Sequence, residues 1–159
     1  MATGKVRRPQ PSIPIRGPLT QASFVDRPNR FLVRTRLEDG RTVPAHLPDP
    51  GRLKELLVPN RRVWLRPAQG TPRKTSWTVV LVQTPSGDGL VSVDTTLPNR
   101  LIAKALRTSA LGEFAGWTLV RAEVPVGASR LDFILESKDR RQLLLEVKSV
   151  TLVENGVGL

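Results

Sequence analysis

Short segments with a two-residue period fill the stretch from about residue 23 to residue 95. Phe31, Val33 and Thr35 alternate with Leu and Arg side chains, and Asp39–Gly40 then gives a strong hairpin-turn signal. The same alternation, broken by Pro and Gly, predicts five strands, at 30–37, 41–47, 61–66, 76–83 and 89–95. Five short strands at regular spacing favour a small β-barrel of the OB type.

The pattern changes from a two-residue period to helical spacing after Thr95. Apolar residues at helical intervals predict a helix over 97–111, ended by Gly112, and three strands follow at 117–126, 130–136 and 142–151. One helix with three strands is a partial α/β arrangement, so we expect a mixed α+β chain with a domain boundary near 94–98. The predicted order is a flexible, basic, proline-rich arm (1–22), an OB-like β-domain (23–95) and the α/β part (96–159).

Charge divides the chain at a similar place. Residues 1–75 hold 16 Lys and Arg against 5 Asp and Glu, whereas residues 76–159 hold nine of each. An excess of +11 confined to the N-terminal half indicates a polyanionic partner, although solubilising surface charge gives the same composition. The chain has no cysteine and one histidine, which excludes disulfides and thiolate zinc sites. Because no apolar run approaches the roughly 18–20 residues of a membrane span, we expect a cytoplasmic protein.

Basic and aromatic residues of the β-domain are the candidate contacts to nucleic acid. Guanidinium and ammonium groups donate to phosphate oxygens, and the residues that we predict in this role are Arg30, Arg61, Arg62, Arg73 and Lys74. Trp64 either stacks on bases or packs inside the barrel, and Phe31 beside Arg30 has the same two interpretations. His46, the single histidine, either bonds a phosphate or holds a turn.

The last two predicted strands form a hairpin whose register can be estimated. If its turn centres on Asp139, then Asp132 and Glu146 are direct cross-strand neighbours, with Cβ atoms roughly 4.5–5.5 Å apart. Lys148 lies two residues beyond Glu146 and therefore shares its face. Both strands are otherwise apolar on both sides, which is typical of strands covered on two faces. The pattern predicts two carboxylates and one ammonium group on a single patch near the core.

Two carboxylates that lie so close repel each other unless a cation relieves the repulsion. Carboxylates that leave room for water and phosphate oxygens suit Mg²⁺, with Mn²⁺ as a substitute, and Glu123 on the preceding strand is a candidate third ligand. Asp132, Glu146 and Lys148 are then candidate catalytic residues of a metal-dependent nuclease, in which Lys148 orients or deprotonates water or stabilises charge on the phosphate. The alternative is a non-catalytic nucleic-acid-binding or interaction module, in which these acids form a structural salt bridge.

An ordered set of motifs resembles a known protein family. The Asp132 and Glu146-x-Lys148 pattern is similar to the core of the PD-(D/E)xK nucleases, and this pattern alone is a weak signal. From about Phe24 to Leu159, the chain also resembles the sugar fermentation stimulation protein A family. The stretches that carry this resemblance are 29–32 (NRFL), 46–52 (HLPDPGR), 73–75 (RKT), 97–101 (LPNRL), 129–133 (SRLDF) and 146–152 (EVKSVTL).

The resemblance implies an OB-like domain followed by a restriction-endonuclease-like α/β domain, of which this chain would hold only the N-terminal part. It also implies DNA binding, described for the family as non-specific, and a regulatory role in sugar (maltose) metabolism. The positions that match the family without an assigned role are His46, Asp49, Asn99, Arg100 and Ser149. Family chains are similar in continuing well past the Glu-x-Lys strand, so we expect a C-terminally truncated chain. In such a chain the apolar face of Leu143, Leu145 and Val147 would lack a cover.

Overall fold

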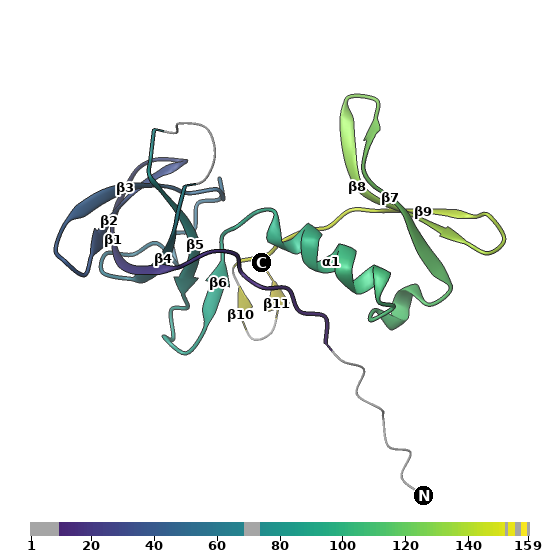
Figure 1. Cartoon of the computed structure of the whole chain (residues 1–159), viewed down its shortest axis with the longest axis horizontal. Helices are drawn as coiled ribbons and strands as arrows, with labels where there is room; N and C mark the ends of the chain where they lie inside the picture. Colours follow the sequence, from purple (N-terminus) through teal and green to yellow (C-terminus); the bar gives the residue numbers. More distant parts are fainter. Residues whose placement is uncertain (1–9, 69–73, 152, 155–156, 159) are drawn as a thin grey trace, which may run out of the picture. The chain divides into compact units, whose positions relative to one another are not determined.

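The computed structural model describes residues 10–68, 74–151, 153–154 and 157–158 (Figure 1). These residues fall into two compact units, one within Met1–Pro14 and Thr96–Lys148, the other within Ile15–Thr95 and Ser149–Leu159. Within the described part of the chain, no helix combines the length and the apolar character that a transmembrane segment requires.

The second of these units, which we call the barrel unit, is built on one six-stranded sheet. Its strands are β1 (Thr20–Asn29), β2 (Leu32–Leu37), β3 (Thr42–His46), β4 (Arg62–Pro67), β5 (Trp77–Gln83) and β6 (Leu90–Ser92). They lie in the order β3-β2-β1-β4-β5-β6, and β3 also pairs in parallel with β5. This additional pairing closes β1–β5 into a five-stranded barrel, which confirms the predicted OB-like architecture.

The strand that the sequence pattern missed is β1. It is ten residues long, but Asp26, Arg27 and Pro28 interrupt its alternation. Its pairing with β2 shifts register on both sides of Asp26, so its inward positions do not keep a strict two-residue period. The strand begins at Thr20, inside the segment 1–22 that was predicted as an arm, and residues 1–9 of that arm lie outside the described residues.

Alternation along β2 shows how the sequence forms the core of the barrel. Val33, Thr35 and Leu37 point inward and are buried, whereas Arg34 and Arg36 between them are exposed. The inward side chains of the other strands, together with residues of the loop after β3, join the same apolar cluster. Burying one Val or Leu side chain contributes about 1.5–3 kcal/mol, so this cluster fixes which face of each strand turns inward.

The other unit, which we call the helix–sheet unit, contains one helix and one antiparallel sheet in the order β7-β8-β9. Its elements are α1 (Leu97–Arg107), the 3₁₀ turn η1 (Gly112–Phe114), β7 (Trp117–Val126), β8 (Ser129–Ser137) and β9 (Gln142–Leu145). Ala103 and Leu106 of α1 form a buried cluster with Phe133 and Leu135 of β8. The predicted set of one helix and three strands is confirmed.

Helix α1 ends four residues before the predicted position 111. Ser109 adopts a left-handed backbone conformation, with φ at 51°, and its N–H donates to the carbonyl of Leu106. This reversal ends the helix ahead of Gly112, which instead begins η1. At the side of the helix, Lys104 Nζ donates to the Ser12 carbonyl at 2.7 Å, so the part of the predicted arm around Ser12 lies against α1.

Strand β9 is shorter than the predicted strand 142–151 and ends at Leu145. The backbone N–H of Val147 donates to Asp132 Oδ2 at 2.7 Å, so a side chain takes the place of the next main-chain partner. The expected lack of cover over Leu143, Leu145 and Val147 is wrong, because all three are partly buried against the α1–β8 cluster. The opposite face of the hairpin is the open one: Leu144 is 59% exposed, so these strands are not covered on both faces.

After Lys148 the chain adds a short antiparallel pair, β10 (Val153–Glu154) and β11 (Val157–Gly158), which belongs to the barrel unit. Val153 and Val157 are each 60% exposed. These two residues therefore add little to the core of the barrel.

Candidate functional site

The β8–β9 hairpin has the register that the sequence predicted. Phe133 pairs with Leu145, Ile134 with Leu144, Leu135 with Leu143 and Glu136 with Gln142. Continuing this register by one step places Asp132 opposite Glu146, immediately beyond the last main-chain pair. The two acids are therefore cross-strand neighbours at the point where β9 ends.

Asp132 is held by two donors from different parts of the helix–sheet unit. Its Oδ1 accepts a hydrogen bond from Asn99 Nδ2 of α1 at 2.6 Å, and its Oδ2 accepts the Val147 N–H at 2.7 Å. The side chain is half-buried between the sheet and the first turn of the helix. Both carboxylate oxygens are thus oriented, and one carboxylate ties α1, β8 and the segment after β9 together.

Glu146 and Lys148 form an ion pair, with Lys148 Nζ 2.7 Å from Glu146 Oε1. The hydrogen bond to Glu146 and the negative charge of Glu146 raise the pKa of Lys148; desolvation opposes this increase, and the charge of Asp132 adds a smaller one. The lysine therefore carries its proton at neutral pH. In this arrangement Lys148 offers a positive charge and a hydrogen-bond donor, and the deprotonating role considered for it would require the pair to open.

Glu123 lies in the same cross-strand row and is paired with Arg130. The β7–β8 register pairs Ala122 with Phe133 and Val124 with Leu131, which leaves Glu123 opposite Asp132. Glu123 has a left-handed backbone, with φ at 52°, a conformation that is strained for a side chain of this size. Its Oε2 accepts from Arg130 Nη1 at 3.2 Å. Within the described residues, no group of three or more acids or histidines could hold a metal ion, so Glu123 as a third ligand stays a prediction.

A cavity of about 390 Å³ opens beside these residues in the helix–sheet unit. Its walls come from the start of α1 and from β7 and β8, and they consist of Thr96, Asn99, Arg100, Ala103, Ala122, Glu123 and Phe133. Asn99 links the cavity to Asp132, a role that the sequence did not assign. The sequence did show Asn99 as a polar residue in the first turn of a predicted helix, among apolar residues expected to pack against the sheet.

In the barrel unit, the guanidinium of Arg61, which was predicted to contact phosphate, is bonded to the protein backbone. Its Nη1 donates to the carbonyls of Thr84 and Pro85, at 2.9 and 3.3 Å, and so fastens the β5–β6 turn. Arg62 is exposed on β4, and Trp64 on the same face is half-buried, because Val63 and Leu65 occupy the inward positions. Arg73 lies outside the described residues, whereas Lys74 is exposed.

Arg27, which the sequence did not single out, organises a second group of cations. Its guanidinium donates to the carbonyls of Gly51, Arg52 and Arg30 at 2.6–2.8 Å, and burial lowers the pKa of this group. The clamp brings two loops together around a cavity of about 340 Å³ lined by Arg27, Arg30, Pro50, Gly51, Arg52 and Lys54. We call this the cationic cavity. Its lining contains no carboxylate among the described residues.

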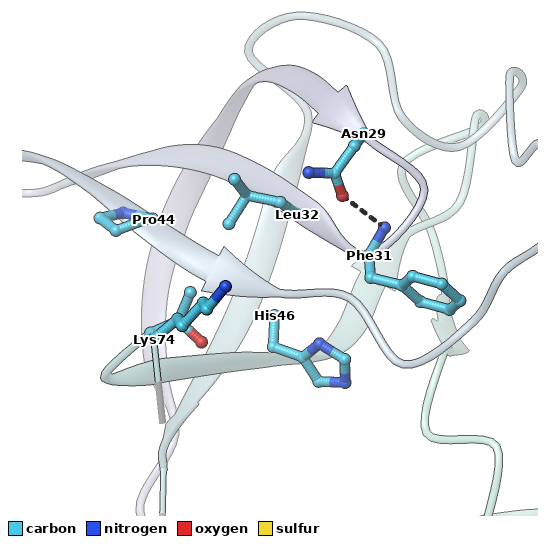
Figure 2. A pocket seen from close by; sticks show the side chains of 7 residues that line it. Asn29, Phe31, Leu32, Pro44, His46 and Lys74 are labelled. Atoms are coloured by element: carbon cyan, nitrogen blue, oxygen red, sulfur yellow. Dashed lines mark hydrogen bonds between the residues drawn. The ribbon is translucent and has the colours of Figure 1, made fainter. Parts of the chain in front are cut away.

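His46, at the end of β3, contacts an aromatic ring. Its imidazole stacks on Phe31, with ring centroids 6.5 Å apart and planes 24° from parallel (Figure 2). Both residues line a further cavity of about 540 Å³, together with Asn29, Leu32, Pro44, Lys74 and Thr75. We call this the aromatic cavity.

Two known family models match the chain, one after the other. Residues 25–93 match the SfsA N-terminal OB domain, and residues 96–159 match the sugar fermentation stimulation protein RE domain. The chain is similar to the sugar fermentation stimulation protein homolog of Shouchella clausii, at 52% identity over 89% of this chain and 60% of that protein. The homolog of Methanothermobacter thermautotrophicus is 40% identical over 92% of this chain and 57% of that protein.

A solved structure agrees with this result. The chain is similar to Pyrococcus furiosus SfsA, determined in complex with Ca²⁺, with a TM-score of 0.73 and 29% identity. That match covers 87% of this chain and 58% of the other. The chain therefore spans a little over half the length of the relatives that it matches.

Proposed function

Because the chain belongs to the sugar fermentation stimulation protein family, we propose that it is a cytoplasmic protein that binds DNA without sequence preference and serves the regulation of sugar (maltose) metabolism. The observation that carries the DNA-binding proposal is the cationic cavity of the barrel unit. Arg30, Arg52 and Lys54 line it, and within the described residues none of the ion pairs involves them.

Three cations gathered on an OB-like barrel suit phosphate groups rather than base edges. Guanidinium groups bind phosphate oxygens through two parallel hydrogen bonds, and such contacts position a nucleic acid without reading its sequence. The half-buried Arg27 holds the backbone carbonyls of Gly51, Arg52 and Arg30, so the loops that carry the cations are ordered before a ligand arrives. A Cβ at Gly51 would lie 2.9 Å from Asp49 Oδ1, which accepts the Gly51 N–H, so a larger residue here would displace the Asp49 side chain from this loop.

The test is the salt dependence of DNA binding by the double variant Arg30→Ala and Arg52→Ala. Each lost phosphate contact should reduce the slope of log affinity against log salt by about 0.9, so the pair should reduce it by about 1.8. The matched control is Arg34→Ala with Arg41→Ala, which removes the same charge from guanidinium groups already paired with Asp26 and Asp39. Equal slopes in the two double variants would reject the cationic cavity as the phosphate-binding surface.

A second candidate function, metal-dependent cleavage of phosphodiesters, is supported by the meeting of Asp132, Glu146 and Lys148. The two carboxylates are hard oxygen donors of the kind that Mg²⁺ and Mn²⁺ accept, and the P. furiosus relative was determined with Ca²⁺. Asp132 and Glu146 would hold such an ion, which when bound polarises a phosphate and lowers the pKa of its water. Lys148, protonated beside them, would stabilise negative charge that develops on the phosphate.

The competing alternative, a structural ion pair without catalysis, is also supported by particular contacts. Glu146 Oε1 is paired with Lys148, and both oxygens of Asp132 accept hydrogen bonds from the protein itself. A non-catalytic module would show neither a shift of melting temperature with Mg²⁺ nor metal-dependent cleavage, since a cation that binds only the folded state must stabilise it.

Plasmid nicking in Mg²⁺ or Mn²⁺ distinguishes these two alternatives. We expect Asp132→Asn to reduce nicking by roughly 100-fold or more, because it removes a charge from the proposed metal site. Asp139→Asn is the control, since Asp139 is an exposed acid in the turn of the same hairpin. Equal nicking by both variants would reject Asp132 as a catalytic residue, whereas no nicking by the unmodified chain together with no metal-dependent melting shift would favour the non-catalytic alternative.

A further inference from the structure

The aromatic cavity of the barrel unit presents a large apolar ring to solvent. Phe31 is 50% exposed although it lies among strands that bury most of their apolar side chains. Figure 2 shows the Phe31 and His46 rings beside each other at one side of the cavity, with Pro44 and Lys74 toward the other side. An exposed aromatic ring at the mouth of a cavity of about 540 Å³ is an arrangement that suits a flat ligand.

Hydrogen bonds hold the main chain at Phe31, which places its side chain in this exposed position. Asn29 Oδ1 accepts the Phe31 N–H at 3.0 Å, and the Phe31 carbonyl accepts the Leu47 N–H at 2.9 Å. The preceding carbonyl, that of Arg30, accepts from Arg27 at 2.6 Å. The imidazole of His46 supports one side of the ring. Binding of a ligand to Phe31 would therefore cost little conformational entropy at this residue.

Positive charge lies on the lining of this cavity and on the residue next to its ring. Lys74 lines the aromatic cavity itself, and Arg30, the residue before Phe31, lines the cationic cavity with Arg52 and Lys54. The described lining residues of the two cavities include no Asp or Glu. A ligand for this surface thus combines a flat apolar ring with negative charges nearby.

We infer that the aromatic cavity binds an unpaired nucleobase of a single-stranded nucleic acid. The base would stack on Phe31, and the adjoining phosphates would contact Lys74 and Arg30. This inference rests on the proposed nucleic-acid-binding function and adds to it a stacking site that only single strands can use. Bases within a duplex are already stacked on each other and cannot reach the ring, whereas every unpaired base has a face that stacks on an aromatic side chain.

The test compares the affinity of the whole chain for a labelled oligothymidylate and for a duplex of the same length. Phe31→Leu keeps an apolar side chain but removes the stacking surface, and we expect about tenfold weaker binding of the single strand. The salt slope and the affinity for duplex should stay unchanged, because the phosphate contacts remain. Leu90→Ala is the control, since Leu90 is a similarly exposed apolar residue of the same unit, at 52%.

Phe31→Trp tests the same idea from the opposite direction. Indole stacks on bases as well as phenyl does, so this variant should keep the wild-type affinity, and stacking should quench its fluorescence when the oligothymidylate binds. A probe with abasic sites should bind wild type as weakly as the intact probe binds Phe31→Leu. Melting curves of both variants check that the fold is intact.

Two different negative results have different meanings. If Phe31→Leu binds the single strand as tightly as Leu90→Ala does, while wild type still binds DNA with a steep salt dependence, the stacking site is refuted and the proposed DNA binding stands. If wild type binds neither single strand nor duplex at low salt, the proposed function fails, and the inference fails with it.

Discussion

The barrel unit and the helix–sheet unit hold their candidate residues by different physical means. In the barrel, β3 pairs with β5 and closes the sheet, so apolar side chains from every strand meet in one interior. In the helix–sheet unit the three-stranded sheet stays open, and a smaller cluster around Phe133 and Leu135 forms its core. The candidate phosphate and base contacts thus lie on a closed apolar scaffold.

The acidic site depends much more on polar links. Asp132 joins α1 to the segment after β9 through two hydrogen bonds, and the main-chain pairing of β9 with β8 ends at Leu145. Where the sheet ends, a side chain replaces a strand partner. The barrel's candidate binding residues thus lie on a scaffold closed by burial, with the Arg27 clamp ordering their loops, whereas the candidate catalytic site depends on the orientation of one half-buried carboxylate.

Truncating a core side chain should give the largest loss of unfolding free energy, and it compares the closed interior of the barrel with the open face of the β8–β9 hairpin. Leu65 is fully buried in β4, and Leu65→Ala should lower the free energy of unfolding by about 2–5 kcal/mol, because it removes buried methyl groups and leaves a cavity. Leu144→Ala removes the same atoms from a side chain that is 59% exposed, and its cost should stay below about 0.5 kcal/mol. Urea denaturation of both variants measures the difference. Similar costs at the two positions would contradict the open face of the β8–β9 hairpin.

Local pattern was sufficient to predict the parts of the fold that depend on nearby residues. The β8–β9 register followed from one turn and two apolar strands, since a one-residue slip would turn Phe133 and Leu135 out of the core. Alternation of apolar and polar residues likewise predicted four of the barrel's five strands, β2 to β5. The strand β1 was missed because its bulges near Asp26 break the two-residue period, and only pairing with β2 and β4 makes it a strand.

The sequence pattern could not predict which cations are already bonded within the protein, because those bonds join residues that are far apart in sequence. Arg61 was predicted to contact phosphate, yet its guanidinium bonds carbonyls 23 and 24 residues away. Arg27 clamps carbonyls at similar separations and thereby shapes the cationic cavity. Charge and residue type are alike in the two cases, so the sequence indicates which residues are cations but not which cations are already engaged.

A smaller effect should follow from removing the helix contact of Asp132. Asn99→Ala deletes the donor to Oδ1, and we expect a loss of about 1–2 kcal/mol in the free energy of unfolding, because a carboxylate loses a hydrogen bond in a half-buried site. Exchange of the Val147 amide proton should also become faster, since its acceptor Oδ2 is less firmly oriented. Arg107→Ala, at the exposed last turn of α1, is the control and should change neither quantity. If Asn99→Ala is as neutral as this control, then the Asn99 hydrogen bond does not stabilise the site, and the contrast between a scaffold of burial and a site of polar links loses its support from α1.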